Sequence, residues 1–278
     1  MNDSDPHAPP KRGELAAAGN AVAELRCRLD LSHLAEWGGD PAAALRFAQD
    51  AAGLAGDAAE GAFTGDAALR VADLHRRTGQ YTEARDAYAL AVRRHESRGC
   101  LPGLARANKG QAQMERLLGD HGESRLGYER ARAAYETLGD RILVGQCDMH
   151  LGWIHTRAGE LDRAEGCFLR ALTALQGGDD ALRIGLLLGF LARLAHYRGD
   201  RELRQRRLAE AFRVDAGRCL AVPEWPRMLE KLAEGCMREG DPDSAVPLLT
   251  RAAEVWRILR AGDDEQRCRA VLRELQST

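Results

Sequence analysis

The chain has 278 residues and carries 40 Lys and Arg against 42 Asp and Glu, so its formal net charge is −2. This balance excludes a globally basic, nucleic-acid-binding surface, because any such patch would have to be local. Only 5% of the residues are aromatic, and Ala and Leu supply most of the apolar volume, which suits close packing of helix on helix.

Residues 1–12 are polar, acidic at the start and rich in proline, which predicts a disordered tail and no signal peptide. The longest apolar run, residues 184–192, is flanked by arginines and is too short to cross a bilayer. The seven cysteines contain no Cys-x-x-Cys pair, which favours free thiols in a reducing compartment. We therefore expect a cytoplasmic protein that does not contact membranes.

From residue 13 the chain reads as amphipathic helices broken by glycine at a nearly constant interval of forty residues. The glycines predicted to end the first helix of each pair are Gly39, Gly79, Gly119, Gly159, Gly199 and Gly240. A left-handed glycine followed by a polar residue ends one helix and starts the next. Another glycine, such as Gly139 or Gly262, is predicted to end each second helix. A period of this length predicts a solenoid, here of about six helix pairs over residues 13–262.

Small and large residues recur at fixed distances from these turns. In the second pair they are Ala72, Ala84, Tyr88 and Ala91, and in the fourth pair they are Gly152, Ala164, Phe168 and Ala171. Small residues let paired helices approach, and the large residue fills the gap to the next pair. The first pair lacks the large residue, and the fifth has Arg204 where a small residue belongs.

This spacing resembles the tetratricopeptide repeat (TPR). The forty-residue period, together with the segment 137–141 between repeats, resembles the C-terminal TPR arrays of bacterial LuxR-type and signal-transduction ATPase regulators. The resemblance implies an all-α, right-handed α-solenoid. Residues 263–278 read as a further helix that would cap its open end.

No catalytic motif is present: the sequence has no phosphate-binding loop, no dinucleotide fingerprint, no His-Glu-x-x-His and no serine elbow. Cys147, His150 and His155 are the best candidates for metal ligands, since the first two share a helical face. A structural role is favoured, because Cys147 suits a core and His155 stands at the same repeat position as His75. We predict no enzyme, no metal and no cofactor.

The TPR resemblance implies that the first helices line a concave groove. In the four central pairs, eight of the groove positions are Arg or Lys and two are Asp. The cationic positions dominate in the second and third pairs, and aromatic residues join them in the fourth and fifth. The predicted partner-binding residues are Arg76, Arg106, Lys109, Gln113, Arg116, Met149, Trp153, Arg157, Phe190, Arg193, His196 and Tyr197.

These residues predict an interaction scaffold or adaptor that binds a peptide or helix of another protein, acidic and with apolar anchors. An accidental excess of arginine explains the same pattern equally well. One alternative is a regulatory TPR protein that is gated by a small ligand or a signalling peptide. Nucleic acid is not an expected partner, and self-association stays open.

Overall fold

The computed structural model describes residues 12–54, 63–176, 180–218 and 221–277, so the predicted tail lies almost wholly outside the described residues. The described part contains thirteen α-helices and no strand, which confirms the all-α prediction. The helices group into two compact units, which meet in sequence between Asp140 and Arg141. Each unit is described by itself. That residues 13–262 form one continuous solenoid stays a prediction.

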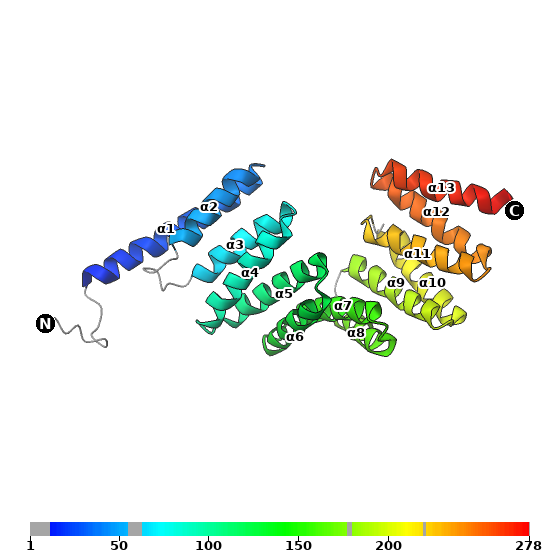
Figure 1. The fold of residues 1–278 in the computed structure, drawn as a ribbon, viewed down its shortest axis with the longest axis horizontal. Helices are drawn as coiled ribbons and strands as arrows, with labels where there is room; N and C mark the ends of the chain where they lie inside the picture. Colours follow the sequence, from blue (N-terminus) through cyan, green and yellow to red (C-terminus); the bar gives the residue numbers. More distant parts are fainter. Residues whose placement is uncertain (1–11, 55–62, 177–179, 219–220, 278) are drawn as a thin grey trace. The chain divides into compact units, whose positions relative to one another are not determined.

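Unit 1 is a series of helix pairs, coloured from blue to green in Figure 1. Its helices are α1 (Arg12–Trp37), α2 (Pro41–Leu54), α3 (Thr64–Arg77), α4 (Tyr81–Glu96), α5 (Leu101–Leu118) and α6 (His121–Thr137). Unit 2 continues the pattern and ends on a single helix. Its helices are α7 (Arg141–Arg157), α8 (Leu161–Leu175), α9 (Ala181–Tyr197), α10 (Arg201–Arg218), α11 (Glu224–Arg238), α12 (Pro242–Ile258) and α13 (Gly262–Ser277).

All six turn glycines adopt the left-handed conformation, with φ between 72° and 93°. In each turn the backbone N–H after the glycine donates to the carbonyl five residues earlier, over 2.8–2.9 Å, as Asp40 does to Ala35 and Asp241 to Cys236. This hydrogen bond satisfies a carbonyl that the end of the helix leaves open. The glycine repeat in the sequence therefore marks one capping geometry that is used six times.

The residue after the glycine acts in one of two ways, according to its length. An aspartate accepts a hydrogen bond from the backbone N–H three residues later, over 2.8–3.2 Å, as Asp40, Asp120, Asp200 and Asp241 do. Gln80 and Glu160 make no such cap. Their longer side chains reach back 2.6 Å to Nδ1 of His75 and His155 instead. The two histidines thus have a structural role in the turn.

The large residues of the second helices pack against glycines of first helices. The ring of Tyr88 occupies the space where a Cβ on Gly110 of the next pair would lie, at 2.3 Å. Phe168 fills the space beside Gly152 of its own pair and stacks on Phe190 of the next, with ring centroids 5.2 Å apart. These contacts confirm that the large residue fills the gap between successive pairs.

The structure explains the irregular Arg204. Its side chain is only 1% exposed, and its guanidinium donates to Glu239 (3.0 Å) and Asp241 (3.3 Å) and lies 3.1 Å from Nδ1 of His196. A buried charge is tolerated when carboxylates compensate it. Arg204 therefore ties the start of α10 to the turn between α11 and α12.

The end of α12 corrects one prediction. Gly262 does not end this helix; it is the first residue of α13. The left-handed position is taken by Arg260, with φ 57°, and the N–H of Ala261 donates to the carbonyl of Trp256 over 3.0 Å. The chain therefore uses the same cap here without glycine, at some cost in backbone strain.

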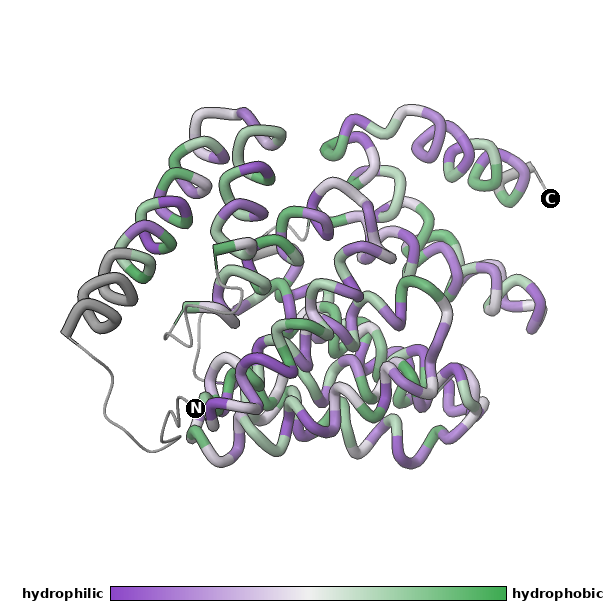
Figure 2. Tube along the Cα trace, turned by 60° about the vertical axis from the view of Figure 1, so that its left-hand side comes forward, coloured by the Kyte–Doolittle hydropathy of each residue, from purple (hydrophilic) through white to green (hydrophobic). Residues whose placement is uncertain are grey.

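The two units are packed differently. Unit 2 has one large apolar cluster that includes Phe168, Trp225 and Trp256, whereas unit 1 has smaller clusters such as the one around Tyr88 and Met114. Hydrophilic and hydrophobic residues alternate along the helices of both units (Figure 2). None of the described helices combines the length and the apolarity that a bilayer crossing requires.

Candidate functional site

In unit 1 the predicted cations of α3 and α5 gather around Asp73. Arg106 pairs directly with this carboxylate, and Nε of Arg76 lies 3.9 Å from it. The hydroxyl of Tyr88 donates to the same carboxylate and accepts from Arg76 Nε at 3.3 Å. Burial, followed by the charge of Asp73, raises the pKa of Tyr88. The two arginines are thus held in an internal network.

A second carboxylate neutralises cations at the neighbouring edge of unit 1. Glu36 of α1 pairs with Arg70 (2.7 Å) and with Arg77. Burial alone would raise the pKa of Glu36, but the hydrogen bonds and charges of the two arginines outweigh it, and the pKa is lowered. Arg70 also donates to the hydroxyl (2.9 Å) and the carbonyl (2.8 Å) of Ser32. Four arginines at the predicted groove positions of unit 1 therefore share two carboxylates of the same unit.

The remaining predicted residues of unit 1 lie on α5. Lys109 is half-buried, with Nζ 5.8 Å from the centroid of the Tyr135 ring, which is within the range of a cation–π contact. Gln113 and Arg116 are half-buried on the same helix. Helices α3 and α5 are in contact, so these residues lie in the same layer of helices as Asp73, Arg76 and Arg106.

In unit 2 the predicted residues include two arginines that lie on aromatic rings. The guanidinium of Arg157 is 5.3 Å from the centroid of Trp153, on α7. The guanidinium of Arg193 is 5.4 Å from the centroid of Phe190, on the neighbouring helix α9. Stacking on aromatic faces holds arginine side chains in place and leaves their N–H groups available for hydrogen bonds.

Neither of these arginines has a carboxylate partner among the described residues. Nε of Arg193 is buried and has no hydrogen-bond acceptor in the described part of the chain. Burial is the main cause that lowers the pKa of Arg193; Tyr197 opposes the shift, and the charge of Arg157 adds to it. The positive charge of Arg157 therefore acts unfavourably on Arg193, and an added anion would offset this cost and the cost of burial.

Three other predicted residues lie on the same two helices, α7 and α9. Tyr197 is 53% exposed at the end of α9. Met149 is half-buried and packs against the apolar core of unit 2. His196 faces inward: its Nδ1 lies 3.3 Å from Glu239, and burial lowers its pKa. Of the three, Tyr197 is the one that presents its ring to the surface.

The metal candidates do not converge. Cys147 is buried, and His155 is 2.6 Å from Glu160 in the turn after α7. Across the described residues, no three His, Cys, Asp or Glu side chains are grouped as metal ligands would be.

Sequence reasoning missed two residues of α1. Glu36 compensates two predicted groove cations, and Trp37 is 90% exposed at the helix end. They stand three and two residues before Gly39, the same positions that Arg116 and Leu117 hold before Gly119. Applying the groove register to the first pair, as well as to the four central pairs, would have found both.

A comparison with known protein families finds a match over helices α7 and α8 of unit 2. Residues 148–181, from α7 to the start of α9, match a family model described as "Tetratricopeptide repeat". This segment matches the TPR family. It contains the predicted groove residues Met149, Trp153 and Arg157. None of the curated proteins matches the sequence.

Solved structures extend the likeness in fold over most of the chain. BtubC (BKLC) from P. vanneervenii is 19% identical, with a TM-score of 0.62 over 74% of this chain and 91% of its own. A Rap protein complexed with competence and sporulation factor is 10% identical, with a TM-score of 0.57 over 92% of this chain and 76% of its own. YrrB, a TPR protein with an unusual peptide-binding site, is 15% identical, with a TM-score of 0.54 over 75% and 95%. At these identities the likeness shows a TPR-type fold; the closer resemblance to LuxR-type regulators stays a prediction.

Proposed function

We propose that this protein is an interaction module that binds an acidic segment of another protein on the α7–α9 surface of unit 2. The observation that carries the proposal is the pair Arg157 and Arg193, two neighbouring guanidinium groups without a carboxylate partner among the described residues. The TPR-type fold supports a protein partner, because YrrB has a peptide-binding site and the Rap protein is complexed with a factor.

The proposed binding mode pairs a carboxylate of the partner with Arg157 and Arg193. An apolar side chain beside that carboxylate packs on Trp153 and Tyr197, which supply the large contact areas typical of binding hot spots. Arginine suits this role because the N–H groups of its planar fork donate to both oxygens of a carboxylate. Since the two charges repel each other in the free protein, partner binding removes an unfavourable interaction as well as adding a favourable one.

The unit 1 residues have a secondary place in the proposal. Arg76 and Arg106 already share Asp73, so an incoming carboxylate would have to compete with it. Lys109, Gln113 and Arg116 are proposed as a separate contact within unit 1. Met149, Phe190 and His196 support the unit 2 surface from below.

A peptide-display selection against the full chain tests the proposal. We expect selected peptides to be rich in Asp and Glu next to Leu or Phe, and to bind more weakly as salt is raised. Charge reversal of both arginines, Arg157→Glu with Arg193→Glu, is expected to weaken binding at least about 100-fold, since each charged hydrogen bond contributes roughly 1.5–3 kcal/mol.

Arg213→Glu is the matched control. Arg213 is an exposed arginine of α10 in the same unit, and within the described residues its side chain bonds only the carbonyl of Ala209, one turn earlier. This variant should bind selected peptides as the wild type does. Selected peptides without acidic residues, or equal loss of binding in both variants, would contradict the proposed site.

A further inference from the structure

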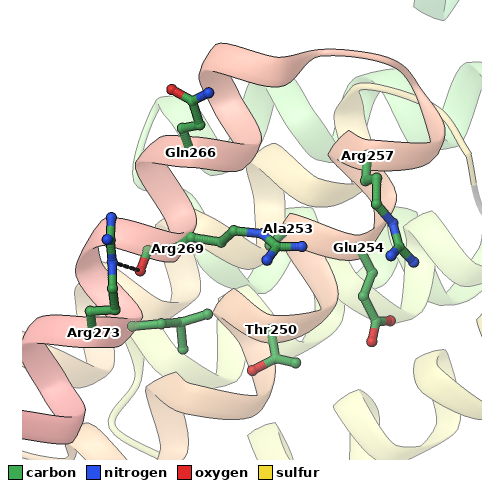
Figure 3. A pocket seen from close by; sticks show the side chains of 8 residues that line it. Thr250, Ala253, Glu254, Arg257, Gln266, Arg269 and Arg273 are labelled. Atoms are coloured by element: carbon green, nitrogen blue, oxygen red, sulfur yellow. Dashed lines mark hydrogen bonds between the residues drawn. The ribbon is translucent and has the colours of Figure 1, made fainter.

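A separate cavity lies between α12 and α13, at the other end of unit 2. Its volume is about 610 Å³, within the range of roughly 300–1,000 Å³ that is typical of small-ligand sites. Figure 3 shows Arg269 extending from α13 towards Ala253 of α12, with Arg257 on the α12 side and Arg273 on the α13 side. Three arginines from two helices therefore line one hollow.

The charges around this cavity are unbalanced. Glu254 is the acidic residue of the lining, and its carboxylate already pairs with Arg251 at 2.7 Å. Arg257 and Arg273 have no carboxylate partner among the described residues, and Nε of Arg273 donates to the carbonyl of Arg269 at 3.4 Å. The lining therefore has two uncompensated positive charges.

The guanidinium of Arg269 can also bind an anionic ligand. Its partner is Glu265, one helical turn earlier at 2.7 Å, and more than half of the Arg269 side chain is exposed. The Glu265 side chain is only 18% exposed, so a dianion that binds Arg269 has to compete with a partly buried carboxylate. Ala253 and the half-buried Leu272 form an apolar part of the lining between the arginines.

We infer that this cavity binds an organic phosphate of nucleotide size. The guanidinium groups of Arg257, Arg269 and Arg273 hold the phosphate oxygens, for which their planar forks are suited. The apolar body of the ligand lies on Leu272 and Ala253. This site shares no residue with the α7–α9 surface, and it does not depend on the function proposed above.

Calorimetric titration of the full chain with ADP, pyrophosphate, adenosine and a glutamate-rich peptide tests the inference. ADP should bind more tightly than pyrophosphate, which lacks the apolar body, and adenosine should bind least. Replacing two arginines, Arg257→Gln with Arg269→Gln, should weaken ADP binding at least about tenfold, because charge-assisted hydrogen bonds are lost.

Arg213→Gln serves as the control, because it removes an exposed arginine of the same unit that lies outside this cavity. It should bind ADP as the wild type does. The inference is overturned if neither ADP nor pyrophosphate binds, if the double variant binds ADP as tightly as the wild type, or if the glutamate-rich peptide binds as tightly as ADP. Both replaced side chains are exposed, and unchanged circular dichroism would show that the variant is folded.

Discussion

Arginines at the predicted groove positions differ between the two units in what they contact. In unit 1, Arg70 and Arg106 pair with Glu36 and Asp73, and hold first helices to one another. In unit 2, Arg157 and Arg193 stack on aromatic rings and have no carboxylate partner among the described residues. The same residue type, at the same kind of repeat position, thus pairs with a carboxylate in one unit and stacks on an aromatic ring in the other.

The largest loss of stability is expected when Arg70, the buried arginine of unit 1, is replaced. Arg70 is only 8% exposed and bonds both Ser32 and Glu36, so Arg70→Ala should lower the free energy of unfolding by about 3 kcal/mol. Urea unfolding followed by circular dichroism measures the change. Arg46→Ala, at an exposed arginine of α2, should stay within about 0.5 kcal/mol of the wild type. Similar losses in both variants would show that Arg70 has no special role.

The second prediction concerns the stability lost when a methyl group is added at a tight helix contact of unit 1. A Cβ on Gly103 would lie 2.3 Å from the ring of the buried His95, whereas a Cβ on Gly166 of α8 would meet only the end of Arg170 at 3.6 Å. Gly103→Ala should therefore cost about 1–3 kcal/mol of stability. Gly166→Ala should be neutral or stabilise by up to about 1 kcal/mol, through helix propensity. Thermal unfolding of the two variants measures the difference. Equal melting temperatures would show that the contact between Gly103 and His95 does not limit the space at this position.

A third prediction compares one substitution at two arginines of unit 2. Arg193→Met removes a half-buried charge without a carboxylate partner among the described residues, so stability should rise by about 1 kcal/mol while acidic peptides bind more weakly. Arg204→Met removes a buried charge that is paired with Glu239 and Asp241, and stability should fall. Denaturant unfolding and peptide titration are the measurements. A loss of stability in Arg193→Met would mean that this arginine supports the fold.

The smallest expected effect is a pH dependence. Burial lowers the pKa of His95 in unit 1 and of His196 in unit 2 below the ordinary value of 6.5. The unfolded chain therefore takes up these protons first, and stability is full above about pH 6.5 and falls as the pH drops below it, by at most about 1.4 kcal/mol per pH unit for each histidine. Unfolding experiments at several pH values should show a shallower fall for His95→Gln and for His196→Gln. An unchanged slope in both would contradict the assignment.

Much of the fold could be predicted from local features. The glycine period identified the turns, because only a residue without a Cβ adopts the left-handed conformation cheaply. The positions of Tyr88 and Phe168 identified how successive pairs pack. The prediction failed at Gly262, since Arg260 provides the left-handed residue there, and no local signal distinguishes an arginine that does so.

The candidate surface could be predicted only in part. Repeat position placed the cations on the first helices. Whether each one is compensated depends on carboxylates such as Glu36, which is 34 residues before Arg70 in sequence and 2.7 Å from it in space. The cavity between α12 and α13 likewise depends on two helices meeting, and nothing in either helix alone predicts it.

The sequence by itself determined the helices, their turns and the all-α class, because helix capping and small-residue packing act between residues that are close along the chain or repeat at a fixed interval. The tertiary structure decided which arginines pair with a carboxylate and which stack on an aromatic ring. Ion pairing depends on distances between side chains of different helices, and those distances exist only once the helices have packed.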